Sequence, residues 1–122
     1  MVEGVGVDIV EVSRIKMSIE DYGSLFTDKI FTQEEIRYSA DKPNPYQHYA
    51  ARFAAKEAFS KATGTGWNSD FSWQEVEVMN ESSGKPCLHL NGLALKTFGK
   101  KNIFLSLSHS GDYVVAVVII ES

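Results

Sequence analysis

Two charged side chains interrupt an otherwise apolar helix face: Glu57 and Lys61 lie four residues apart in the alanine-rich segment 46–63. An exposed pair at this spacing usually contributes only a few tenths of a kcal/mol to stability. Small residues on the same helix would let another element approach the pair closely. These residues are Ala54, Ala55, Ala58 and Ala62. The sequence alone therefore leaves two interpretations open, a surface ion pair and a functional pair.

Asp8 supplies a second carboxylate, in a β-branched segment that predicts a strand. A carboxylate inside such a strand needs a hydrogen-bond donor or a cation, and Asp8 and Glu57 together suggest a divalent cation. Mg²⁺ fits this pair, because it commonly takes one or two carboxylates and completes its shell with waters and substrate phosphates. Lys61, one helical turn beyond Glu57, could then contact those phosphates.

A Gly-x-Gly loop, residues 64–66, follows this helix. Gly64 is a natural residue with which to end a helix. Gly66 adds a second position without a Cβ, where backbone N–H groups could approach an anion. The loop is not of the Walker type, because no helix begins after it and its spacing differs.

His109 lies at the end of a predicted strand among three serines, and either capping of a turn or contact with a phosphate or hydroxyl would explain it. The serines are Ser106, Ser108 and Ser110. A serine hydrolase is not supported, because the sequence contains no Gly-x-Ser-x-Gly motif. We expect His48 and His89 to lie on solvated faces or in satisfied polar contacts.

Composition narrows the possible classes of protein. The 122 residues are 43% hydrophobic and 23% charged, which predicts one folded domain over residues 1–122. The net charge of −4 argues against a nucleic-acid partner, although Arg14, Arg52, Lys56 and Lys61 could be positive locally. The single cysteine excludes an intrachain disulfide and suits a reducing compartment. Without a signal peptide or an apolar run long enough for a membrane, we expect a cytoplasmic protein with no membrane partner.

The hydrophobic pattern predicts an α+β domain. Expected strands cover 4–12, 73–79, 87–90, 103–109 and 113–120, and expected helices cover 13–24, 33–40, 46–63 and about 91–99. Both faces of the first strand carry apolar residues, which favours a central place in its sheet. Ser13 is the expected N-cap of the first helix, and Thr32 with Glu35 forms a capping box for the second.

Three motifs carry a resemblance to a known family. The first is 4–9 with Glu11 and Arg14, the second runs from 52 to 62 into the 64–66 loop, and the third is 105–110. With them, the chain resembles the holo-(acyl-carrier-protein) synthases, the small bacterial class of 4′-phosphopantetheinyl transferases, nearly end to end. The resemblance implies an antiparallel sheet packed against a long central helix, usually in a homotrimer with active sites between subunits. It also implies transfer of 4′-phosphopantetheine from coenzyme A to a serine of apo acyl carrier protein, which leaves adenosine 3′,5′-bisphosphate.

The resemblance also implies roles for individual residues. Asp8 and Glu57 would hold Mg²⁺ against the pyrophosphate, and Lys61 would neutralise phosphate charge. The nucleotide end of coenzyme A would meet Arg52, Lys61, Gly64, Gly66, Ser108, His109 and Ser110, with His109 near the 3′-phosphate. The acidic carrier protein would meet Arg14, with apolar contact from Ile15 and Met17.

One departure from the family concerns the expected carrier-protein surface. Glu20 and Asp21 stand where many relatives carry basic residues, so we expect this contact to depend chiefly on Arg14, with Lys16 as a second candidate.

Two other classes of function stay open on sequence grounds. They are a non-catalytic module that binds a nucleotide or coenzyme, and a structural oligomerisation domain.

Overall fold

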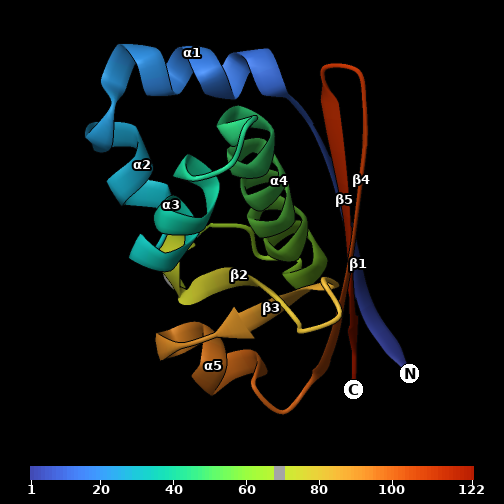
Figure 1. Cartoon of the computed structure of the whole chain (residues 1–122). Coiled ribbons are helices and arrows are strands. Elements are labelled where there is room, and N and C mark those ends of the chain that lie inside the picture. Colours follow the sequence, from blue (N-terminus) through green and yellow to red (C-terminus); the bar gives the residue numbers. More distant parts are fainter. Residues whose placement is uncertain (68–70) are drawn as a thin grey trace.

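The computed structural model describes residues 1–67 and 71–122, which form an α+β fold around one long helix (Figure 1). A three-stranded antiparallel sheet has the order β1 (Val2–Glu11), β5 (Tyr113–Glu121), β4 (Asn102–Ser110). Helix α4 (Pro45–Thr63) packs against one face of this sheet. On the other side of α4 lie α1 (Val12–Tyr22), α2 (Ser24–Ile30) and α3 (Gln33–Ala40).

A second, smaller sheet closes one end of the molecule (Figure 1). It pairs β2 (Val76–Asn80) with β3 (Pro86–Leu90), flanked by the 3₁₀ turn η1 (Trp73–Glu75) and by α5 (Gly92–Phe98). Within the described residues, no helix is long and apolar enough to cross a membrane.

Strand β1 lies at an edge of its sheet, so the prediction of a central strand was wrong for this chain. Its two faces have different surroundings. Gly6 and Val10 face α4, whereas Val5, Val7 and Ile9 are between 55% and 63% exposed on the outer face. The apolar residues on both faces predict that both faces are buried. In the part of the chain that the structure describes, only one face is covered.

The contact between β1 and α4 depends on small residues on both elements. A Cβ added at Gly6 would collide with the carbonyl oxygen of Ala58, and one added at Gly4 would collide with that of Ala62. The two backbones therefore lie close together, as the small residues predicted on this helix allow. This approach determines how far the side chains of β1 lie from those of α4.

The first helix begins differently from the prediction. Helix α1 starts at Val12, and Ser13 lies inside its first turn, so Ser13 is not the N-cap. Instead Asp112, in the turn between β4 and β5, accepts hydrogen bonds from the Ser13 amide at 3.2 Å and from its hydroxyl at 2.6 Å. The Asp112 carbonyl also accepts the Val12 amide at 2.7 Å. The cap comes from a residue far along the chain, which a local pattern does not indicate.

The remaining elements follow the predictions closely. Thr32 and Glu35 form the expected capping box at the start of α3, and Gly64 ends α4 in the left-handed conformation with φ of 79°. The final hairpin is confirmed, with Ser110 paired to Tyr113. Two elements differ from the prediction: helix α2 was not predicted, and residues 73–75, predicted as strand, form the η1 turn.

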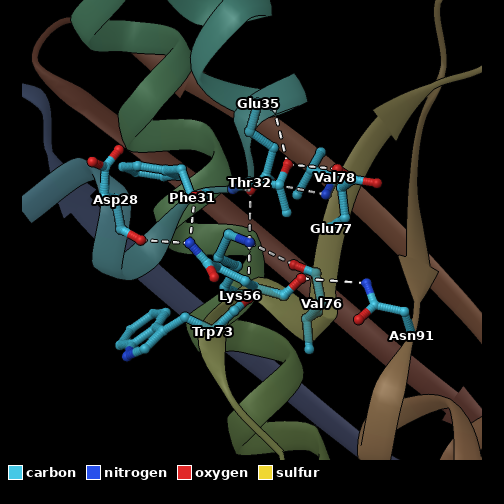
Figure 2. A network of polar contacts seen from close by, with 11 residues as sticks. Asp28, Phe31, Thr32, Glu35, Lys56, Trp73, Val76, Glu77, Val78 and Asn91 are labelled. Atoms are coloured by element: carbon cyan, nitrogen blue, oxygen red, sulfur yellow. Dashed lines mark hydrogen bonds and ion pairs between the residues drawn. The ribbon is translucent and has the colours of Figure 1, made fainter. Parts of the chain in front are cut away.

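A buried ion pair joins the helices to the small sheet (Figure 2). Lys56 of α4 and Glu35 of α3 are both fully buried, with Nζ 2.8 Å from the Glu35 carboxylate. Lys56 also donates to the carbonyls of Trp73 at 3.0 Å and Val76 at 2.6 Å, and Glu35 accepts the amide of Val78 at 2.7 Å. Burial lowers the pKa of Lys56, and the carboxylate of Glu35 opposes that shift. Lys56 therefore belongs to the interior and adds nothing to a positive surface.

The close contact of β1 with α4 can be tested by a Gly6→Ala substitution. Because the new methyl group would meet the backbone of α4, we expect the free energy of unfolding to fall by about 3 kcal/mol. Chemical denaturation measures this loss. The control is Gly111→Ala, where no atom lies within 4 Å and the positive φ of 58° should cost about 1–2 kcal/mol. Equal losses in the two variants would contradict close packing at Gly6.

Candidate active site

An open cavity of about 350 Å³ lies where β1 runs into α1, beside the middle of α4. Asp8, Arg14 and Glu57 all line it, although they come from three different elements. Phe53 and Tyr113 are among its other lining residues, so the cavity combines charged and aromatic side chains. The structure thus brings both predicted metal ligands and the predicted carrier-protein contact to one place.

Lys61 meets Asp8 across the contact between α4 and β1. Its Nζ lies 2.8 Å from Asp8 Oδ1 and also donates to the Val7 carbonyl at 3.2 Å. The Asp8 side chain is 13% exposed, whereas that of Lys61 is 53% exposed. Lys61 is therefore held at one end and still reaches solvent, which suits a cation that can contact an incoming anion.

Glu57 has a different kind of partner. Its Oε1 accepts a hydrogen bond from the indole Nε1 of Trp67 at 2.8 Å. Trp67 was not identified from the sequence, because a tryptophan just after a Gly-x-Gly loop carries no recognised signal of contact with a carboxylate. Of the carboxylates that line the cavity, Asp8 thus has a charged donor and Glu57 a neutral one.

The donor set fits a hard divalent cation that also binds a substrate. Among residues 1–67 and 71–122, no group of three or more His, Cys, Asp or Glu side chains is placed to enclose a metal ion. Asp8 and Glu57 instead line one open cavity, where their carboxylates provide only oxygen ligands. Mg²⁺ characteristically binds through one or two carboxylates, with waters and substrate phosphates in the other positions.

A second polar cluster surrounds Tyr38, near the N-terminal half of α4. The guanidinium of Arg52 lies 4.1 Å from the Tyr38 ring centroid and the ammonium of Lys42 lies 4.3 Å from it. His48 packs edge-on against the same ring. Burial lowers the pKa of His48, as do the positive charges of Arg52, Lys42 and His109. This cluster contains Arg52, one of the residues expected at the nucleotide.

The other residues expected at the nucleotide lie elsewhere. Gly64 and Gly66 follow the C-terminal end of α4, and Gly64 is roughly 18 Å from Arg52 along the helix axis. Residues 108–110 are exposed at the end of β4, the edge strand opposite β1. A single chain therefore does not gather all of the predicted nucleotide contacts into one site.

Of the three α1 residues expected to meet the carrier protein, two are exposed and one is buried. Arg14 is exposed and Met17 is 60% exposed, and both line a further open cavity of about 400 Å³. Ile15 is only 5% exposed and belongs to the core, so the expectation that it touches a partner was wrong. Its position on the helix turns it toward the interior. Arg14 lines both cavities and so joins the α1 surface to the carboxylates.

Comparison with known proteins agrees with the fold and with the family resemblance. The profile of the 4′-phosphopantetheinyl transferase superfamily matches residues 4–118. The holo-(acyl-carrier-protein) synthase of Chloroherpeton thalassium is 49% identical over 96% of each chain, and that of Solibacter usitatus is 49% identical over the full length of both.

Solved structures agree as well. The holo-(acyl-carrier-protein) synthase of Neisseria meningitidis superposes with a TM-score of 0.91 at 34% identity over the whole of both chains. That of Bacillus anthracis, solved in complex with coenzyme A (3′,5′-ADP), has a TM-score of 0.85 at 35% identity and covers 100% of this chain and 98% of its own. The chain belongs to the 4′-phosphopantetheinyl transferase superfamily.

Proposed function

We propose that the chain is a holo-(acyl-carrier-protein) synthase, acting as one domain over residues 1–122. It transfers 4′-phosphopantetheine from coenzyme A to a serine of apo acyl carrier protein and releases adenosine 3′,5′-bisphosphate. The observation that carries this conclusion is that Asp8 and Glu57 line one cavity, with Lys61 paired to Asp8, in a chain that matches such synthases over its full length. A cytoplasmic location is part of the proposal and is consistent with the single cysteine.

The reaction requires charge neutralisation and alignment more than covalent chemistry from the protein. The serine oxygen bonds to the phosphorus that carries the pantetheine arm, while the bond from that phosphorus to the bridging oxygen breaks. The bridging oxygen leaves with adenosine 3′,5′-bisphosphate, and the serine proton is lost. Lys61 is paired with Asp8 and open to solvent, which supports a role in contacting the phosphate oxygens.

Asp8 and Glu57 are the proposed ligands of Mg²⁺. A divalent cation at a pyrophosphate supplies charge neutralisation and orients the phosphoryl group. In this chain Asp8 and Glu57 would hold such an ion at the cavity, and the ammonium of Lys61, paired with Asp8, would add a second positive charge.

The proposed docking surface for the acidic carrier protein is the exposed side of α1. Arg14 lines both the cavity that contains Asp8 and Glu57 (the carboxylate cavity) and the cavity beside Met17 (the α1 cavity). A partner bound to α1 would therefore bring its serine toward Asp8 and Glu57. Met17 offers apolar contact area beside this cation.

A homotrimer with active sites between subunits completes the proposal. The outer face of the β1–β5–β4 sheet is apolar and exposed, as at Val5, Val7, Ile9 and Phe104. Apolar patches of this kind on a soluble protein usually mark contact surfaces. A shared site would also explain why Arg52 and the Gly64–Gly66 loop lie far apart in one chain, because each could serve a different copy of the ligand.

The transferase assignment is tested by intact mass of the carrier protein. Incubation of apo acyl carrier protein with the enzyme, coenzyme A and Mg²⁺ should add the mass of one phosphopantetheine group. Removal of Mg²⁺ by a chelator should abolish the gain, and Glu57→Gln should lose most activity while keeping its fold. No mass gain, with a known transferase active in parallel, would overturn the assignment. Stabilisation by coenzyme A without any transfer would instead favour a binding module.

The role of Arg14 predicts a selective change in kinetics. Because Arg14 is an exposed cation of α1 that lines both cavities, Arg14→Ala should raise KM for the carrier protein about tenfold and change KM for coenzyme A little. Lys29→Ala, which removes a cation from α2, serves as the control. Equal increases in both KM values for Arg14→Ala would argue against a docking role.

The trimer predicts that a charge on the outer sheet face will separate the subunits. Val7→Glu places a carboxylate on this face and should convert the protein from trimer to monomer, with loss of transfer activity. Leu25→Glu is the matched control, because Leu25 is an exposed apolar residue on α2. Light scattering gives the mass of each. A monomeric wild-type protein, or a Val7→Glu variant that remains trimeric, would contradict the proposed interface.

A further inference from the structure

Trp67 is the hydrogen-bond donor that the structure places on Glu57. Its indole Nε1 donates to Oε1 at 2.8 Å. In the part of the chain that the structure describes, no other residue is recorded as donating to this carboxylate. One oxygen of Glu57 is therefore held by the protein, while the residue still lines the carboxylate cavity.

The indole of Trp67 is itself held in place by other rings. It stacks on Trp73 with ring centroids 4.0 Å apart and planes 25° apart, and it meets Phe71 edge-on at 5.1 Å. Trp73 stacks in turn on Phe53, another lining residue of the cavity, at 5.2 Å. Trp67 thus reaches Glu57 from an aromatic stack that fixes the direction of its N–H.

The aromatic stack is anchored to the buried ion pair. Lys56 donates to the backbone carbonyl of Trp73 at 3.0 Å, as Figure 2 shows. Lys56 and Glu57 are adjacent in α4, yet Lys56 points into the core and Glu57 lines the cavity. The turn that carries Trp73 is therefore fixed to the same helix that carries Glu57.

The neutral character of the donor matters for a cation site. Asp8 is paired with the charged Lys61, which already offsets part of its negative charge. The indole N–H satisfies one oxygen of Glu57 without adding a positive charge, so this donor is not a cation that would repel a metal ion. Hydrogen bonds to the carboxylates that ligate metals orient them, and their loss typically weakens metal binding about 10–100-fold.

We propose that Trp67 is a positioning residue for the cation site: its N–H fixes Glu57 so that the carboxylate is presented to Mg²⁺. This inference rests on the proposed function, because it takes Asp8 and Glu57 to be the cation ligands. The competing explanation is that Trp67 only fills space beside Trp73 and Phe71. The two explanations differ in what the N–H contributes, since packing needs the ring alone.

The decisive variant is Trp67→Phe, which keeps an aromatic ring and removes the N–H. Trp73→Phe is the matched control, because it makes the same change in the stack and leaves the Trp67 donor intact. Calorimetric titration of Mg²⁺ into protein saturated with coenzyme A, without carrier protein, measures binding in the absence of turnover. We expect the Mg²⁺ dissociation constant to rise about tenfold in Trp67→Phe and to stay near the wild-type value in Trp73→Phe.

Two further readouts separate positioning from packing. Transfer by Trp67→Phe should be slow at limiting Mg²⁺ and recover at saturating Mg²⁺, with thermal stability of the metal-free protein nearly unchanged. The chain has only two tryptophans, so Trp67 is the sole indole in Trp73→Phe. Its emission should respond to Mg²⁺, whereas the emission of Trp67→Phe should respond little.

The outcomes distinguish this inference from the proposed metal site. If Glu57→Gln loses Mg²⁺ binding while Trp67→Phe binds as the wild-type protein does, the positioning role is wrong and the proposed function stands. If Glu57→Gln binds Mg²⁺ as tightly as the wild-type protein, the metal site itself is wrong and the inference falls with it. Weaker binding in Trp67→Phe and Trp73→Phe alike would show that packing, and not the N–H, is what matters.

Discussion

The ion pair between Lys56 and Glu35 is the interaction on which the arrangement of helices, small sheet and site depends. Both side chains are fully buried, and between them they bond to α3, α4, the η1 turn and β2. Removal of one partner from such a pair typically costs about 3–5 kcal/mol, because the other charge is left uncompensated. The pair is therefore valuable less as a source of stability than as a constraint, since few other arrangements would satisfy every one of its donors and acceptors.

A second constraint, the contact of α4 with β1, complements this polar one. Glycine on the strand and alanine on the helix let the two backbones approach, and this approach lets Lys61 reach Asp8 at 2.8 Å. Longer side chains at Gly4 or Gly6 would separate the elements and with them the two halves of the site. Helix α4 thus carries three differently placed side chains. Lys61 contacts β1 of the large sheet, Lys56 is buried in the interior, and Glu57 lines the cavity.

The sequence predicted best what depends on neighbours along the chain. The Thr32–Glu35 capping box and the Gly64 helix end are local patterns, and both were correct. The N-terminus of α1 was predicted wrongly because its cap, Asp112, comes from the last hairpin. Lys56 looked like a surface cation because nothing local indicates that Glu35 will meet it. Trp67 was missed for the same reason, since its contact with Glu57 requires the chain to turn back after α4. Apolar residues on both faces of β1 suggested a central strand, although within residues 1–67 and 71–122 only one of its faces is covered.

The distribution of charge explains how an acidic chain could serve two anionic ligands. The net charge is −4, yet three cations lie in three different parts of the fold. Lys61 is paired with Asp8 and open to solvent, and Arg14 is exposed on α1. Arg52 lies in the separate cluster around Tyr38. Since that cluster lies well along α4 from the Gly64–Gly66 loop, the residues proposed to contact the nucleotide fall in two separate regions of the chain. In a closed oligomer each region could face the complementary region of a neighbour, so a chain of 122 residues could enclose a ligand larger than its own cavities.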